Sequence, residues 1–136
     1  MGQLYGQTPG WFVEGLAEYF TEKWRPLRFD LSHKYHTLKN SLHKIKDPHN
    51  DGFSKVMYFA DKYGDQKLVQ ILNHRDSLKL FNFSQAFETH AGITVKQFEE
   101  DWRRQMSTYY YGLRSQKEIY EDIGKTYSLT LYYVYF

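Results

Sequence analysis

Cysteine is absent from the sequence, so the chain forms no disulfide and offers no thiolate to a metal ion. It also lacks any run of 18 apolar residues, the length that a membrane-spanning helix needs. The first residues, MGQLYGQTPGW, have neither the basic start nor the apolar centre of a signal peptide. These absences predict no membrane span and no disulfide scaffold, and they leave the compartment open.

An excess of charge of one sign is missing too. Eighteen Lys and Arg stand against sixteen Asp and Glu, and the two signs are interspersed along the chain. A nucleic-acid-binding domain usually gathers basic side chains on one face. The three tyrosines at 109–111 lie near arginines, but neighbouring acidic residues dilute any basic groove. We therefore predict no nucleic-acid partner and expect these tyrosines to pack between domains.

Aromatic residues are abundant instead, with 13 Tyr, 10 Phe and 3 Trp among 136 residues. The length is that of about one domain, and an apolar share of 41% is enough for a core. Apolar residues recur mostly at helical spacing. The expected fold is all-α, with five or six helices in one compact unit over residues 1–124.

Capping residues, prolines and glycines delimit the expected helices. Thr8 as cap and Pro9 as first residue begin a helix that Pro26 ends by residue 25. Thr94 and Gln97 form a capping box for a long last helix that runs to about residue 123. The other helices are expected at 32–45, at 53–63 with Gly64 after it, from Asp65 onward, and at 83–90 with Gly92 closing it. The stretch 46–52 is expected to be a loop.

The C-terminal tail has a different composition. Residues 128–136, SLTLYYVYF, are rich in β-branched and aromatic side chains and read as a strand. A lone strand has no partner in a helical unit. We therefore expect a boundary near residue 124, with 125–136 as a strand-like tail that begins a second, β-rich unit.

The stretch PGWFVEGLAEYF, residues 9–20, carries two carboxylates on a helix with an aromatic face. Glu14 and Glu18 are four residues apart and so lie on the same face. Both can be solvated side chains beside a core stripe, which suits Glu18 more easily than Glu14, because the direct neighbours of Glu14 are apolar. Gly15 costs about 0.5–1 kcal/mol relative to alanine inside a helix, which is usual where another group approaches the backbone closely.

This stretch resembles the third-ligand helix of gluzincin zinc peptidases, the peptidase MA-like group, with its Trp-x-x-Glu-Gly signature. Residues 49–64 are similar to a later helix of that family, and residues 83–103 to its final pair of helices. The resemblance covers residues 8–124, and it is nearest to bacterial proteins in which this unit precedes a TolB-like β-propeller. It implies that Glu14 is a zinc ligand and that Glu18 is a second-shell acceptor for a ligating imidazole.

Two departures from the family pattern matter. None of the six histidines begins an H-E-x-x-H motif, which in relatives lies upstream and supplies two ligands and the base. His49 stands where some relatives carry a tyrosine that stabilises the oxyanion, so it is either a substitute donor or an ordinary loop residue. We therefore expect a C-terminal peptidase portion that is inactive by itself, with zinc bound only if other ligands come from outside this chain.

The resemblance also implies partners. They are the missing N-terminal peptidase half, a β-propeller, and a peptide or protein substrate for the intact parent, at an extracytoplasmic place. The alternative is a non-catalytic helical scaffold attached to a propeller. Loss of the upstream half is expected to expose apolar surface around Trp11 and Phe12 and so to favour self-association. His33 and His36, three residues apart, could share a metal, but their polar neighbours favour a solvent-exposed face.

Overall fold

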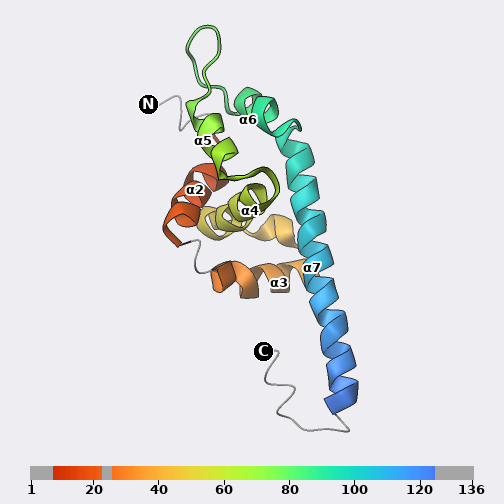
Figure 1. Ribbon diagram of the computed structural model, residues 1–136. Helices are drawn as coiled ribbons and strands as arrows, with labels where there is room; N and C mark the ends of the chain where they lie inside the picture. The colour runs from red at the N-terminus through yellow and green to blue at the C-terminus, as the bar shows by residue number, and fades with distance from the viewer. Residues whose placement is uncertain (1–7, 23–25, 125–136) are drawn as a thin grey trace.

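The computed structural model describes residues 8–22 and 26–124, with the helices arranged as in Figure 1. The described residues form six α-helices and two short 3-10 helices, without a strand, which confirms the all-α prediction. In chain order the elements are α2 (Gly10–Glu22), η1 (Pro26–Phe29), α3 (Asp30–Leu38), η2 (Leu42–Lys44), α4 (Pro48–Tyr63), α5 (Asp65–Asn73), α6 (Phe83–Ala91) and α7 (Val95–Gly124). The predicted strand at 128–136 lies outside the described residues.

Two helices far apart in sequence, α2 and α4, form the most extensive packing of the molecule. Helices α5 and α6 lie at one end of this pair, and α7 runs along its side and extends past it (Figure 1). Helix α3 reaches α7, where the Tyr110 hydroxyl donates to Asp30 Oδ1 at 2.7 Å. None of the described helices is both long and apolar enough to cross a membrane.

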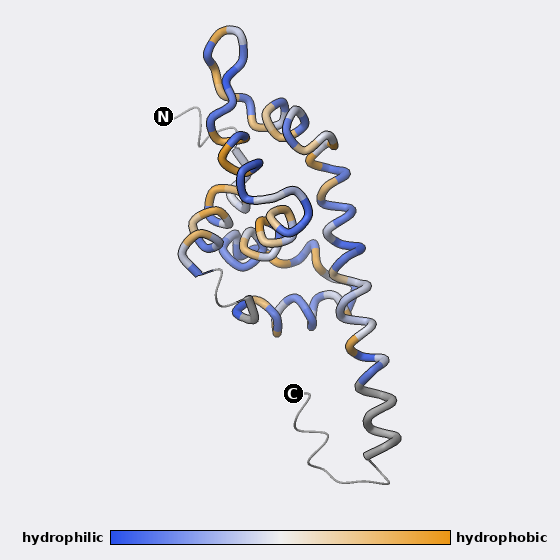
Figure 2. The backbone as a smooth tube through the Cα atoms, viewed as in Figure 1, coloured by the Kyte–Doolittle hydropathy of each residue, from blue (hydrophilic) through white to orange (hydrophobic). Residues whose placement is uncertain are grey.

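The core is mainly aromatic and lies where α2, α4, α6 and α7 meet. Phe98 of α7 is fully buried and stacks on Trp11, with ring centroids 5.9 Å apart. Its other ring neighbours include Phe59 and Phe87, at 5.7 and 5.3 Å. In Figure 2 many of the orange, hydrophobic segments lie where the helices cluster, and others lie on the loop that follows α5. Each aromatic ring pair contributes about 0.5–1.5 kcal/mol beyond its buried area, so this cluster ties the helices together.

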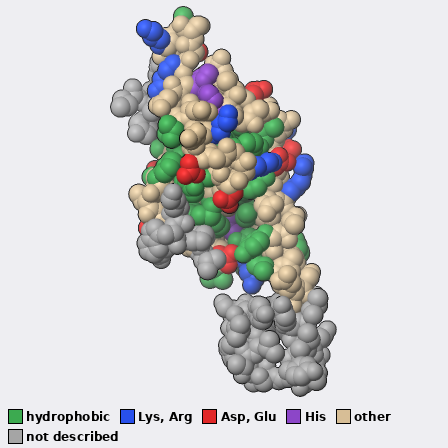
Figure 3. All heavy atoms as spheres, in the orientation of Figure 1, with side chains coloured by type: hydrophobic (Ala, Val, Ile, Leu, Met, Phe, Trp, Pro, Cys, Tyr) green, Lys and Arg blue, Asp and Glu red, His purple; other side chains and the backbone are tan. Residues whose placement is uncertain are grey.

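The expected exposure of Trp11 and Phe12 is wrong. Trp11 is 9% exposed and Phe12 is 1% exposed, and both contact Phe83 of α6. The helices of this chain cover both rings without an upstream half. Some hydrophobic side chains still reach the surface in the middle of the face shown in Figure 3. Self-association itself stays a prediction.

Most predicted helix ends agree with the structure. Gly64 and Gly92 have positive φ angles of 93° and 77°, which glycine adopts at little cost after a helix. Thr94 and Gln97 form the predicted reciprocal capping bonds of 3.1 and 2.9 Å. Helix α2 begins at Gly10, one residue later than predicted, because the Pro9 carbonyl accepts the first helical bonds.

Two predicted boundaries are wrong. Helix α4 begins at Pro48, so most of the expected loop at 46–52 is helical. The Asp47 side chain caps this helix by accepting from the backbone N–H of His49 at 3.0 Å, and Pro48 fits the first turn. The helix expected at 32–45 spans only Asp30–Leu38, because Asn40 adopts a positive φ of 51° and turns the chain.

Candidate functional site

Where α2 crosses α4, the two helix backbones lie too close together for any side chain to fit between them. A Cβ placed on Gly15 would lie 2.8 Å from the Cα of Gly52, and a Cβ on Gly52 would lie 2.8 Å from the Cα of Gly15. Real Cβ atoms do not approach other atoms that closely. Glycine on both helices therefore lets the two backbones touch. This agrees with the sequence expectation that Gly15 marks a close approach, and it fixes the first turn of α4 above α2.

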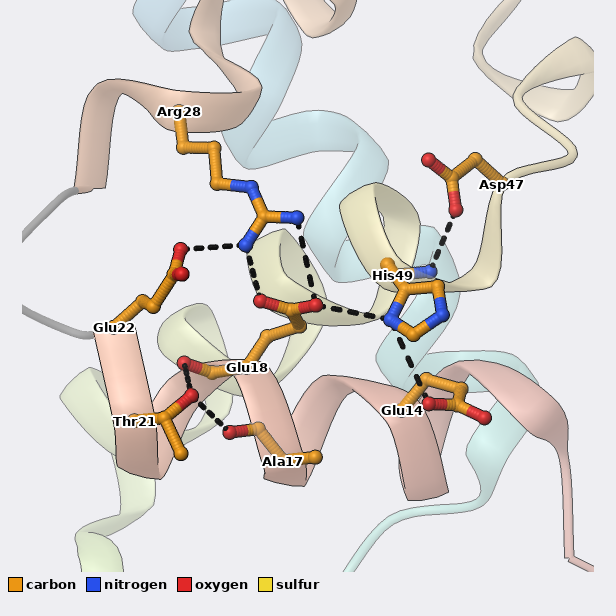
Figure 4. Close-up of polar contacts among 8 residues, drawn as sticks. All are labelled: Glu14, Ala17, Glu18, Thr21, Glu22, Arg28, Asp47 and His49. Atoms are coloured by element: carbon orange, nitrogen blue, oxygen red, sulfur yellow. Dashed lines mark hydrogen bonds and ion pairs between the residues drawn. The ribbon is translucent and has the colours of Figure 1, made fainter.

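The crossing brings His49, in the first turn of α4, onto the two carboxylates of α2 (Figure 4). His49 Nδ1 lies 2.9 Å from Glu18 Oε1, within hydrogen-bond distance. The same nitrogen lies 3.5 Å from Glu14 Oε2, which is a looser ion-pair contact. Glu18 has a side chain only 15% exposed, whereas Glu14 is 41% exposed. The structure thus gathers the three residues that the sequence singled out.

A cationic side chain completes the cluster from another element. Arg28 of η1 pairs with Glu18 and with Glu22, the latter at 2.5 Å (Figure 4). The hydrogen bond to Glu22, with a further one to Glu18, raises the pKa of Arg28 despite some desolvation. Sequence reasoning missed Arg28, because it lies ten residues from Glu18 and outside the helix that carries the carboxylates. Glu18 is thus the centre of the network, while Glu14 lies at its edge.

The geometry limits what His49 can donate. Since carboxylates only accept when ionised, Nδ1 must carry the proton that is shared with Glu18. In the neutral ring Nε2 is then an acceptor, and only the protonated ring can donate from Nε2. The oxyanion role therefore requires His49 as imidazolium.

A catalytic metal ion would need more donors than this cluster provides. Within residues 8–22 and 26–124, no group of three or more His, Asp or Glu side chains is arranged to hold a metal ion. Glu14 has the half-exposed carboxylate that a ligand needs, and its contact to His49 is loose. Two further protein ligands would have to come from elsewhere for a catalytic site.

The expectation that His33 and His36 lie on a solvent face is wrong for His33. His33 is fully buried, its Nδ1 lies 3.0 Å from the Phe29 carbonyl oxygen, and its ring meets Trp102 edge-on at 5.9 Å. Burial lowers the pKa of His33 to about 4. His36 is half-buried and its Nδ1 lies 2.9 Å from Ser41 Oγ. Each imidazole therefore has a different partner.

Comparison with protein families, curated proteins and solved structures finds no match for this chain. The functional interpretation therefore depends on the motif resemblance and on the geometry of the Glu14, Glu18 and His49 cluster. The fold supplies the positions of these side chains, while their chemistry must be tested directly.

Proposed function

We propose that this chain is the C-terminal helical portion of a gluzincin-type zinc peptidase. Glu14 is the third zinc ligand in this proposal, and Glu18 is the acceptor that orients an imidazole. The observation that carries it is the position of Glu14. Its carboxylate projects half-exposed from a helix whose backbone is locked by the Gly15–Gly52 crossing, and a rigid helix is a suitable support for a metal ligand.

The chemistry needs more than this chain contains. When bound, zinc supplies a Lewis acid and lowers the pKa of a coordinated water to about 7. Glu14 would hold the metal through one carboxylate, and Glu18 would accept a hydrogen bond from the side of an imidazole away from the metal. His49 would contribute from the first turn of α4, in its protonated form, to stabilise developing negative charge. The H-E-x-x-H half would come from outside the 136 residues, and the substrate is a peptide bond.

The first test reads the DNA upstream of the coding sequence. We expect an H-E-x-x-H segment about twenty residues before the position of Glu14, in frame or frame-shifted. The extended chain is then purified, and its zinc content is measured after dialysis. One zinc per chain is expected, lost in Glu14→Gln and retained in Glu22→Gln, which removes the same charge on the same helix. Retention of zinc by Glu14→Gln contradicts the ligand role.

The purified 136-residue chain provides a second test. We expect it to show no proteolysis of a denatured protein substrate, with or without added zinc. Proteolysis that a chelator abolishes, in a sample free of other proteases, contradicts the proposal that the chain is incomplete.

A non-catalytic scaffold is the second candidate, and one observation favours it. Glu18 already pairs with Arg28 and His49 inside this chain, as a structural ion-pair network does. If no H-E-x-x-H segment exists upstream, a separate chain must supply the histidines or the scaffold is correct. Zinc binding that depends on both Glu14 and a co-purified chain supports the former, and zinc-independent association supports the latter.

A further inference from the structure

A pocket of about 350 Å³ opens between η1 and α3, α4 and α7, away from the carboxylates of α2. Its walls consist mainly of methionine and tyrosine side chains, namely Met57 and Tyr58 of α4 and Met106, Tyr109 and Tyr110 of α7. The volume is at the small end of the range for ligand sites. It suits a compact group.

Hydrogen bonds fix the walls of this pocket. The buried Tyr110 hydroxyl donates to Asp30 Oδ1 at 2.7 Å, and burial raises the pKa of Tyr110, so the hydroxyl stays a donor. On α4, Ser54 accepts from Trp102 Nε1 at 2.8 Å and contacts the sulfur of Met106 at 3.7 Å. The lining is therefore held in place by the fold before any ligand arrives.

Two carboxylates lie at the pocket, Asp30 and Asp61. Among the described residues, no lysine or arginine pairs with either of them. The ammonium of Lys62 contacts the Tyr58 hydroxyl at 3.4 Å and Asp101 at 3.6 Å. Its charge is thus balanced by a carboxylate outside the pocket, and the two pocket carboxylates keep their negative potential.

We propose that this pocket binds an organic cation of the alkylammonium class, as a free amine or as a lysine side chain. Aromatic faces attract ammonium groups by about 0.5–2 kcal/mol, and carboxylates add charge-assisted hydrogen bonds. The methionines contact the aliphatic stem. An anion is repelled by Asp30 and Asp61, and a neutral ligand gains no charge-assisted hydrogen bond from them. This proposal is independent of the peptidase assignment.

Methionine methyl groups report on the pocket directly. The sequence has three methionines, and two of them, Met57 and Met106, line the pocket. The full chain is labelled with ¹³C at the methionine methyl, and the signals are assigned with Met57→Leu and Met106→Leu. Titration with N-acetyl-lysine methylamide, butylamine or choline is expected to shift the Met57 and Met106 signals, and an unchanged pair of signals contradicts the site.

A comparison of ligands shows whether binding requires the positive charge, and whether the ammonium group belongs to a peptide side chain or to a free amine. N-acetyl-norleucine methylamide has the same stem without the charge, and we expect it to bind about tenfold more weakly than the lysine compound. Tighter binding of the lysine compound than of butylamine assigns the pocket to a peptide side chain, and the reverse assigns it to a free amine. Equal binding of the norleucine and lysine compounds, or no shift with any cation, overturns the proposal.

Substitution of each carboxylate by its amide tests the role of its charge in cation binding. Asp61 is exposed, so Asp61→Asn should leave unfolding unchanged and weaken cation binding about three- to tenfold. Glu88→Gln removes the same charge from an exposed site on α6 and serves as the matched control. The cation affinity of Asp30→Asn is interpreted only if its free energy of unfolding equals that of the parent chain. An equal effect of Asp61→Asn and Glu88→Gln means that the cations bind through net charge alone, which contradicts a built site.

Discussion

Gly15 and Gly52 touch through their backbones, 37 residues apart in sequence, where α2 crosses α4. This one contact sets the height of the first turn of α4 above α2. It therefore also sets the position of His49 over Glu14 and Glu18. The aromatic core beneath the crossing, with Phe12 and Val56 almost fully buried, leaves little room for the helices to move apart.

Adding a methyl group at this crossing should destabilise the fold. Gly15→Ala and Gly52→Ala each place a Cβ against backbone atoms that cannot rotate away, and overpacking of this kind costs about 1–3 kcal/mol. The measurement is urea unfolding monitored by circular dichroism. Gly112→Ala is the control, since no atom lies within 4 Å of its added Cβ, and it should stabilise α7 by about 0.5–1 kcal/mol. Equal stability of Gly15→Ala and the parent chain contradicts the tight crossing.

Local chemistry explains which parts of the fold the sequence predicts. Caps, stop residues and helical periodicity act within a few residues, so Gly64, Gly92 and the Thr94–Gln97 capping box were predictable. The prediction of a loop at 46–52 is wrong because Asp, Pro and Gly can either break a helix or begin one. Here Asp47 caps the helix, Pro48 fills its first turn, and Gly52 accommodates α2. Only the tertiary contact distinguishes the two uses of the same residues.

In the cluster of Glu14, Glu18 and His49, too, the sequence predicts local relationships but not contacts between distant residues. Glu14 and Glu18 were predictable as a pair, because an i, i+4 spacing places them on one face. The contact of Glu18 with His49 spans 31 positions and depends on the helix crossing, and the pairing with Arg28 depends on a separate element. The prediction that His33 is exposed is wrong for a similar reason, since its polar sequence neighbours do not reveal that Trp102 covers it.

Removing the buried ammonium of Lys55 should cost more than any surface charge. Its Nζ lies 2.9 Å from Asp51 Oδ2, 3.4 Å from Glu99 Oε1, and about 5 Å from the ring centroids of Trp11 and Trp102. Lys55→Met leaves Asp51 buried without its cation, a loss of about 3–5 kcal/mol at neutral pH. Lys62→Met, at an exposed pair, should cost less than about 1 kcal/mol by the same urea unfolding.

The deficit of Lys55→Met should shrink in acid. Burial already raises the pKa of Asp51, and loss of the lysine raises it further. A carboxyl with a raised folded-state pKa destabilises the fold fully above that pKa, and protonation relieves the cost as the pH falls through it. Unfolding of the variant and parent is compared between pH 7 and pH 4. A constant difference across that range contradicts the assignment to Asp51.

His33 should make the fold acid-sensitive. Its pKa is about 4 in the folded chain and about 6.5 when exposed, because burial disfavours the imidazolium. The unfolded chain then binds more protons between these values, so stability falls as the pH drops from about 6.5 toward 4, by at most about 3 kcal/mol. His33→Gln, which keeps a donor for the Phe29 carbonyl, should flatten that slope. His43→Gln, at an exposed position, should retain it, and an unchanged slope in His33→Gln contradicts the prediction.

Glu14 and Glu18 should differ in what they contribute to folding. Glu18 pairs with Arg28 and His49, so Glu18→Gln should cost about 0.5–1 kcal/mol, a loss that 0.5 M salt reduces. Glu14 is more exposed and only loosely in contact, so Glu14→Gln should change the free energy of unfolding by less than about 0.5 kcal/mol. A stability-neutral carboxylate beside a buried aromatic face is what a ligand position requires. If Glu14→Gln destabilises the chain as much as Glu18→Gln, Glu14 is a structural member of the network, and the case for a metal ligand weakens accordingly.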